Sequence, residues 1–175
     1  MRGGGRRREA ALTTASGRRR RVLAVASAGG HWVELMRLAP AWEGAEVTFL
    51  TTRAEARAAL ARTASAAGRP PPRVLVVPEA TRWSRARLAA QAAMVALALL
   101  RVRPDAVLTT GASVGYFALR LGRLMGARTV WVDSIANVEA LSMSGAMAGR
   151  HADLWLTQWP GLAREGGPLH RGAVL

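Results

Sequence analysis

Short apolar runs alternate with longer helical segments along most of the chain, and this alternation constrains the fold more than any other feature. Six runs of four or five residues have the composition of buried strands, at residues 22–26, 47–50, 74–77, 106–109, 129–132 and 154–157. Strands separated by helical segments indicate βαβ units, which build a parallel sheet with helices on both faces. The sequence therefore predicts an α/β fold with a doubly wound, mostly parallel sheet.

Length and composition limit the chain to one folded domain without thiol chemistry. Its 175 residues, half of them hydrophobic, suffice for one domain with a core and are too few for two full-sized ones. Cysteine is absent, which excludes disulfide bonds, a thiol nucleophile and thiolate metal ligands. The histidines at 31, 151 and 170 show no metal-ligand spacing, so no metal site is expected. No apolar run reaches the roughly 18 residues of a transmembrane helix.

Positive charge is concentrated at the amino terminus. The chain carries 25 basic residues, all of them Arg, against 11 acidic residues, for a net charge of +14. Residues 1–21 hold eight Arg and one Glu without apolar periodicity. We therefore predict a disordered basic tail over 1–21, a folded domain over 22–165 and an irregular tail over 166–175. The basic tail suits an anionic membrane surface or is a solvated extension. Nucleic acid is not expected as a partner because no nucleic-acid-binding motif is present.

The first candidate loop, Ser27-Ala-Gly29-Gly30-His31, follows the first predicted strand. Ligands of doubly wound folds bind at the carboxyl ends of strands. Glycines let the backbone approach a ligand closely, and the free amides at a helix start attract phosphate. An imidazole can accept or donate a proton near neutral pH. The loop therefore fits a phosphate site with a general base, although a tight turn with His31 at a helix start fits the same residues.

The second candidate loop, at residues 111–115, matches the Gly-x-Ser-x-Gly pattern of a hydrolase nucleophile elbow. An aspartate followed by His170 would complete a serine triad around Ser113 in the chain order of that class. Against this, His170 lies in a Gly/Pro-rich segment, and the chain is short for a hydrolase of that fold. A phosphate- or sugar-binding turn that uses Thr110, Gly111 and Ser113 is favoured.

Two further polar loops follow the strands predicted at 129–132 and 154–157. Asp133, Ser134 and Asn137 offer a carboxylate, a hydroxyl and an amide, which suit a hydroxyl-rich ligand or satisfy a local turn. Gln158 and Trp159 follow the last predicted strand, where the indole could stack on a ring or cover the core. All four loops are expected at one edge of the sheet.

The predicted helix over 84–103 is apolar on every side. Between Arg87 and Arg101 the only polar residue is Gln91. A helix of this kind is buried or contacts lipid. Thirteen residues span roughly 20 Å, less than a ~30 Å hydrocarbon core, and Trp83 with its Arg neighbours resembles an interfacial anchor. The pattern leaves a core helix and a membrane-surface helix equally open.

Five motifs occur in order across the predicted domain. They are Ser-Ala-Gly-Gly-His-x-x-Glu-Leu at 27–35, Arg-Pro-Asp-x-Val-x-Thr-Thr-Gly-Ala at 103–112, Val-Trp-Val-Asp-Ser at 130–134, Ser-x-Ser-Gly at 142–145 and Ala-Asp-x-x-x-x-Gln-Trp-Pro at 152–160. This set resembles the membrane-associated subunit of split GT-B glycosyltransferases, a family that includes asparagine-linked glycosylation protein fourteen and bacterial PssD-like proteins. More distantly it is similar to the amino-terminal half of MurG.

The resemblance implies a Rossmann-like half of a GT-B enzyme that binds the acceptor. A separate donor-binding glycosyltransferase subunit would complete a heterodimer, and the pair would move a sugar from a UDP-sugar to a polyprenyl-diphosphate-linked saccharide. The family's reaction uses no metal or further cofactor. The implied location is peripheral, at the cytoplasmic face of the cell membrane. A membrane scaffold that only recruits the catalytic subunit is the alternative role.

The resemblance also assigns roles to matching residues. His31 is the candidate base. Acceptor or phosphate binding is expected from Ser27, Gly29, Gly30, Glu34, Thr110, Gly111, Ser113, Asp133, Ser134 and Asn137. The cleft or the partner interface is expected to include Ser142, Gly145, Gln158 and Trp159. Position 133 is Asp where the family commonly has Glu, and the basic tail matches no part of the family pattern.

Overall fold

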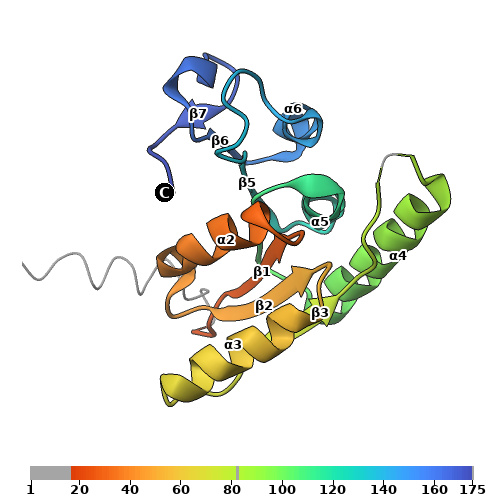
Figure 1. Cartoon of the computed structure of the whole chain (residues 1–175), viewed down its shortest axis with the longest axis vertical. Helices are drawn as coiled ribbons and strands as arrows, with labels where there is room; N and C mark the ends of the chain where they lie inside the picture. Colours follow the sequence, from red (N-terminus) through yellow and green to blue (C-terminus); the bar gives the residue numbers. More distant parts are fainter. Residues whose placement is uncertain (1–16, 82, 175) are drawn as a thin grey trace, which may run out of the picture.

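A seven-stranded sheet runs through the computed structural model, which describes residues 17–81 and 83–174 (Figure 1). The strands are β1 (Arg21–Ala26), β2 (Glu46–Thr51), β3 (Arg73–Val76), β4 (Ala106–Thr109), β5 (Arg128–Val132), β6 (Leu154–Thr157) and β7 (Leu169–His170). They are ordered β3-β2-β1-β4-β5-β6-β7, and each pair of neighbours is parallel. The predicted parallel α/β fold is confirmed.

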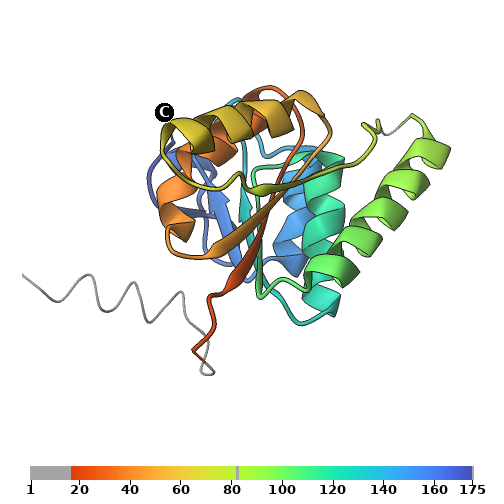
Figure 2. The same cartoon turned by 90° about the horizontal axis from the view of Figure 1, so that it is seen from below.

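Helices cover both faces of the sheet. They are α2 (Gly30–Arg37), α3 (Glu55–Ala66), α4 (Arg85–Val102), α5 (Ala112–Leu124) and α6 (Met143–Ala148), with 3-10 turns η1 (Ala39–Trp42), η2 (Gly149–His151) and η3 (Pro160–Leu162). Figure 2 shows α2 and α3 on one face and α4, α5 and α6 on the other. This three-layer arrangement explains why the strands are apolar along most of their length.

The core alternates along β1, the central strand. Val22 and Ala24 pack with Leu35 of α2 on one face of the sheet. Leu23 and Val25 pack with Leu99 of α4 and its neighbours on the other face. A third cluster joins Leu119, Trp131 and Ala148, which fixes α6 against α5 and β5. Both faces are therefore closed, and functional groups are concentrated at the ends of the strands.

Several predicted boundaries differ from the structure. Arg21 belongs to β1, and Arg18 pairs with Asp105, so the fold begins before residue 22. Residues 1–16 of the predicted basic tail lie outside the described residues. At the other end, β7 pairs with β6 inside the segment that was expected to be irregular. The glycine turn predicted at 111–115 is instead the first part of α5, which begins at Ala112.

The apolar helix α4 has one buried face and one exposed face. The side chains that face the sheet and α5 are buried: Gln91, Val95, Ala98, Leu99 and Val102. Met94, Leu97 and Leu100 are 42%, 45% and 59% exposed on the opposite face. Within residues 17–81 and 83–174, no helix is both long enough and apolar enough to cross a membrane. We refer to Met94, Leu97 and Leu100 as the exposed stripe of α4.

Candidate functional site

The four polar loops meet at the carboxyl edge of the sheet. They follow β1, β4, β5 and β6, which are neighbours in the strand order. From β1 the chain passes into α2 on one face, and from β4 it passes into α5 on the other face. The strand order thus reverses direction between β1 and β4, which is the place where doubly wound folds bind ligands. The structure therefore brings the predicted loops together.

His31 lies in the first turn of α2, against the loop that follows β4. The hydroxyl of Thr110 donates a 2.7 Å hydrogen bond to the backbone carbonyl of His31. A Cβ atom at Gly111 would be 2.7 Å from Cε1 of the imidazole, and Gly111 has a φ of 135°. Only glycine allows both the backbone conformation and this close approach. The glycine therefore supports the imidazole, whose side chain remains 27% exposed.

Glu34 faces His31 from the same side of α2. Nδ1 of His31 and Oε2 of Glu34 are 4.0 Å apart, as expected for residues three positions apart on a helix. Both atoms are buried and have no hydrogen-bond partner in the structure. Because buried polar atoms normally have partners, a small movement that joins these two is favourable. That contact would place a proton on Nδ1 and leave Nε2 as an acceptor.

The other oxygen of Glu34 ties α2 to the loop after β5. Oε1 accepts 2.9 Å hydrogen bonds from the hydroxyl of Ser134 and from the backbone N–H of Ile135. Glu34 is only 4% exposed. Its carboxylate is therefore held between α2 and a loop that is about a hundred residues away in sequence.

Asp133 holds the segment that follows β5. Its carboxylate accepts hydrogen bonds of 2.7 and 3.0 Å from the hydroxyl and backbone N–H of Ser142, and of 3.0 and 3.2 Å from Asn137 Nδ2 and Trp131 Nε1. The residue is 1% exposed. A Cβ atom at Gly145 would be 2.3 Å from Oδ1, so glycine is needed there. Of the two roles that the sequence allowed for this loop, a hydroxyl-rich ligand or a local turn, these bonds of Asp133 fit the turn.

Gln158 and Trp159 extend this support to β6. Gln158 Nε2 donates to the backbone carbonyl of Asp133 at 3.1 Å, and Trp159 Nε1 donates to the carbonyl of Ile135 at 2.7 Å. Gln158 Oε1 accepts a 2.8 Å hydrogen bond from the backbone N–H of Val174. The segment after β5 is therefore held from α2, from α6 and from β6.

Ser113 is joined to α4 instead of to a histidine. Its hydroxyl donates to Gln91 Oε1 at 2.7 Å, and Gln91 Nε2 donates to the carbonyl of Pro78 at 2.8 Å. His170 lies in β7, three strands from β4 in the sheet. The described residues therefore do not form the triad that a serine hydrolase requires. Gln91 was visible in the sequence as the one polar residue of the apolar helix, but its partner was not.

The predicted site residues differ in their exposure, and Ser113, Asn137, Ser142 and Trp159 are partly exposed. Gly29 and Gly30 are exposed, Ser27 and His31 are partly exposed, and Gly29 has a φ of 75° with open space around it. Thr110, Ser134 and Gln158 are buried. No three His, Asp or Glu side chains gather in a metal-binding cluster anywhere in the described part of the chain. The accessible surface of the site thus includes the exposed glycine loop at the start of α2 and the edge of the imidazole.

These features define a class: a Rossmann-like α/β domain with a glycine loop and a histidine at the switch point of its sheet. Comparison with known proteins specifies the family. Residues 22–170 match the family model described as "Oligosaccharide biosynthesis protein Alg14 like", and the chain belongs to this family. It is 34% identical to the UDP-N-acetylglucosamine transferase subunit ALG14 of Eremothecium gossypii, over 82% of this chain and 75% of that protein.

Solved structures support the same fold. MurG of Acinetobacter baumannii superposes with a TM-score of 0.64 at 15% identity, over 86% of this chain and 45% of that one. UDP-N-acetylglucosamine 2-epimerase of Rickettsia bellii superposes with a TM-score of 0.61 at 13% identity, over 88% of this chain and 45% of that one. The chain thus spans about half the length of these structures. The likeness establishes the fold of one of their halves.

Proposed function

We propose that this protein is the acceptor-binding subunit of a two-chain glycosyltransferase. The pair transfers a sugar from a UDP-sugar to a polyprenyl-diphosphate-linked saccharide, in oligosaccharide or polysaccharide biosynthesis. The observation that carries the proposal is the His31 imidazole, seated on Gly111 at the switch point with Glu34 facing its Nδ1. The name of the Eremothecium relative, a UDP-N-acetylglucosamine transferase subunit, supports it from sequence.

In the proposed reaction His31 is the general base. Nε2 takes the proton of the acceptor hydroxyl while the hydroxyl oxygen forms a bond to the anomeric carbon of the donor sugar. The bond between that carbon and UDP breaks, and UDP leaves with the electron pair. Glu34 is a positioning residue in this scheme, because its carboxylate holds the proton of Nδ1 and stabilises the imidazolium that forms. His31 keeps 27% of its side chain exposed, which allows it to meet a substrate.

The glycine loop is proposed to bind the acceptor diphosphate. Gly29 and Gly30 are exposed and precede the first turn of α2, where backbone N–H groups lack helical partners. These amides and the positive end of the helix dipole favour an anion. The diphosphate would then lie one residue from His31, next to the sugar that accepts transfer.

A second chain is proposed to complete the cleft. Three apolar side chains at the carboxyl edge are exposed: Val33 by 50% on α2, Val138 by 52% after β5 and Met143 by 58% at the start of α6. Val33 is next to Glu34 in α2, Val138 lies in the loop that begins after β5, and Met143 follows Ser142. Exposed apolar groups beside a polar site are typical of a protein interface. The donor-binding subunit is the partner that we assign to this edge.

The exposed stripe of α4 is proposed to contact the membrane that carries the acceptor, at its cytoplasmic face. Trp83, before the helix, is 80% exposed, and Arg85 and Arg87 lie in the first turn. An apolar stripe with Trp and Arg at its end is typical of interfacial helices. Leu97→Asp with Leu100→Asp should abolish flotation with anionic vesicles. The control, Ala58→Asp with Ala66→Asp on exposed positions of α3, should leave flotation unchanged. Equal loss of flotation in the two variants would contradict the proposed membrane contact of α4.

Sugar transfer into extractable lipid tests the proposed function. Membranes that contain this chain are supplied with labelled UDP-sugars, with and without the donor-binding subunit. We expect transfer only when both chains are present. Absence of transfer from every UDP-sugar, with both chains folded and associated on acceptor-bearing membranes, would overturn the proposal.

A further inference from the structure

The amino-terminal edge of the sheet, opposite the candidate site, contains a hollow lined by arginines. Arg20 and Arg21 enter β1, Arg103 follows α4, and Arg128 begins β5. Because the strands are parallel and adjacent, their starts meet at this edge. The hollow has a volume of about 480 Å³, within the range of small-molecule sites. Pro104, Asp105, Met125 and Gly126 complete its lining.

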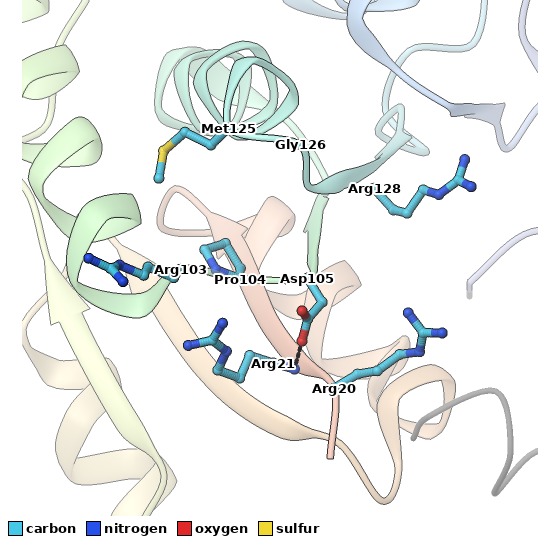
Figure 3. A pocket seen from close by; sticks show the side chains of 8 residues that line it. All are labelled: Arg20, Arg21, Arg103, Pro104, Asp105, Met125, Gly126 and Arg128. Atoms are coloured by element: carbon cyan, nitrogen blue, oxygen red, sulfur yellow. Dashed lines mark hydrogen bonds between the residues drawn. The ribbon is translucent and has the colours of Figure 1, made fainter. Parts of the chain in front are cut away.

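The four arginines of the lining lie on both sides of Asp105. Figure 3 shows Arg21 and Arg103 on one side of Asp105, and Arg20 and Arg128 on the other. The Nε atoms of Arg20 and Arg21 are buried and have no hydrogen-bond partner in the structure. Buried N–H groups of this kind normally have an acceptor. Two N–H donors of the lining residues are therefore without an acceptor among the described residues.

The carboxylate in the hollow is already neutralised. Asp105 accepts hydrogen bonds of 2.6 and 2.8 Å from Arg18 and of 2.7 Å from the backbone N–H of Arg21. These contacts, led by the Arg18 bond, lower the pKa of Asp105 to about 2 against the opposing effect of burial. Arg18 does not line the hollow, so the pair it forms with Asp105 leaves the charge of the four lining arginines in excess.

We propose that this hollow binds a phosphate group, and that its source is the headgroup of an anionic phospholipid. A guanidinium group matches the oxygens of phosphate with parallel N–H donors, and four of them line this hollow. The hollow also has an apolar border. Met125 is 43% exposed, Leu124 beside it is 77% exposed, and Leu100, one turn before Arg103, is 59% exposed. An anionic group bordered by exposed apolar side chains is the arrangement that a lipid headgroup and its chains require.

Two binding measurements on the full chain test the site. The first uses vesicles of phosphatidylcholine that contain phosphatidylglycerol as the minority lipid, and the second uses inorganic phosphate in a calorimeter. The test variant is Arg21→Gln with Arg103→Gln. The control, Arg62→Gln with Arg69→Gln, removes the same charge from exposed positions at and after α3. Residues 1–16 are the same in both proteins, so their contribution to vesicle binding cancels.

We expect the test variant to bind vesicles about thirtyfold more weakly than the control, since each of the two arginines contributes roughly 1 kcal/mol near an anionic surface. If Arg21→Gln with Arg103→Gln instead abolishes binding of inorganic phosphate and leaves vesicle binding at the control level, the hollow binds a soluble phosphate compound and not a lipid headgroup. Equal vesicle binding by the two variants, with no phosphate bound by the wild type, would overturn the proposal.

Thermal unfolding shows whether the variants are folded. If Arg21→Gln with Arg103→Gln fails to fold, Arg20→Gln with Arg128→Gln tests the other pair in the same two measurements. Neither measurement uses sugar transfer. A failure of the phosphate site therefore leaves the proposed function untouched, and a failure of the proposed function leaves the phosphate site untouched.

Discussion

The two edges of the sheet are built from polar residues in opposite ways. At the carboxyl edge, polar side chains bond to one another, as Glu34 does to Ser134 and Asp133 does to Ser142. At the amino edge, four arginines line an open hollow around one neutralised carboxylate. The first edge is a hydrogen-bonded support for the partly exposed imidazole of His31, which suits chemistry that needs exact placement. The second is a concentration of charge, which suits binding an anion without chemistry.

Removing the Asp133 carboxylate, which holds the carboxyl edge together, should have the largest effect on the free energy of unfolding. Asp133→Ala removes a buried carboxylate and leaves the N–H groups of Trp131, Asn137 and Ser142 without their acceptor. We expect a loss of about 3–5 kcal/mol in the free energy of unfolding, measured by urea denaturation. A loss below about 1 kcal/mol would mean that water satisfies these donors as well as Asp133 does.

Gly111→Ala tests the close approach beneath His31. The added Cβ would be 2.7 Å from Cε1 of the imidazole, on a backbone with a φ of 135°. We expect about 2–3 kcal/mol of destabilisation and a fall in transfer, because the imidazole is displaced. Gly68→Ala is the matched control, since Gly68 has a φ of 63° with nothing within 4 Å. Equal destabilisation of the two variants would show that His31 does not rest on Gly111.

Glu34→Gln distinguishes two roles of this carboxylate, which are to hold the loop after β5 and to position the His31 imidazole. The amide oxygen can still accept from Ser134 and Ile135, while the amide N–H then faces Nδ1 of His31 and favours the wrong tautomer. We expect a fall in kcat of about tenfold with KM unchanged and near-normal stability. Urea denaturation and an initial-rate series on the two-chain enzyme measure the two quantities. Unchanged kcat would remove Glu34 from the mechanism.

Asp105→Asn, at the amino edge of the sheet, should have the smallest effect on the free energy of unfolding. A carboxyl whose folded pKa is lowered contributes stability above its unfolded pKa, and this contribution is lost as the pH falls through about 2. We expect the variant to be about 1 kcal/mol less stable at neutral pH, with the difference vanishing toward pH 2. Sugar transfer should be unchanged. A pH-independent difference would contradict the low pKa.

Features that depend on the local pattern of apolar and polar residues could be predicted from the sequence. Apolar runs located six strands, and the polar loops after four of them were expected at one edge of the sheet. It missed β7, because the two residues Leu169–His170 carry no periodicity. The contact of Glu34 with Ser134 also could not be predicted, because it depends on β1, β4 and β5 lying side by side. The arginine hollow was missed for the same reason.

The assignment of chemistry to the carboxyl edge is tested most directly by the transfer rate of His31→Ala in the two-chain enzyme. The control is Arg62→Gln with Arg69→Gln, and affinity for the donor-binding subunit is measured in parallel. We predict a fall of about 10²-fold or more in kcat for His31→Ala, with subunit affinity and the control unchanged. Near-normal turnover by His31→Ala would contradict the account and leave this chain as a scaffold for chemistry on its partner.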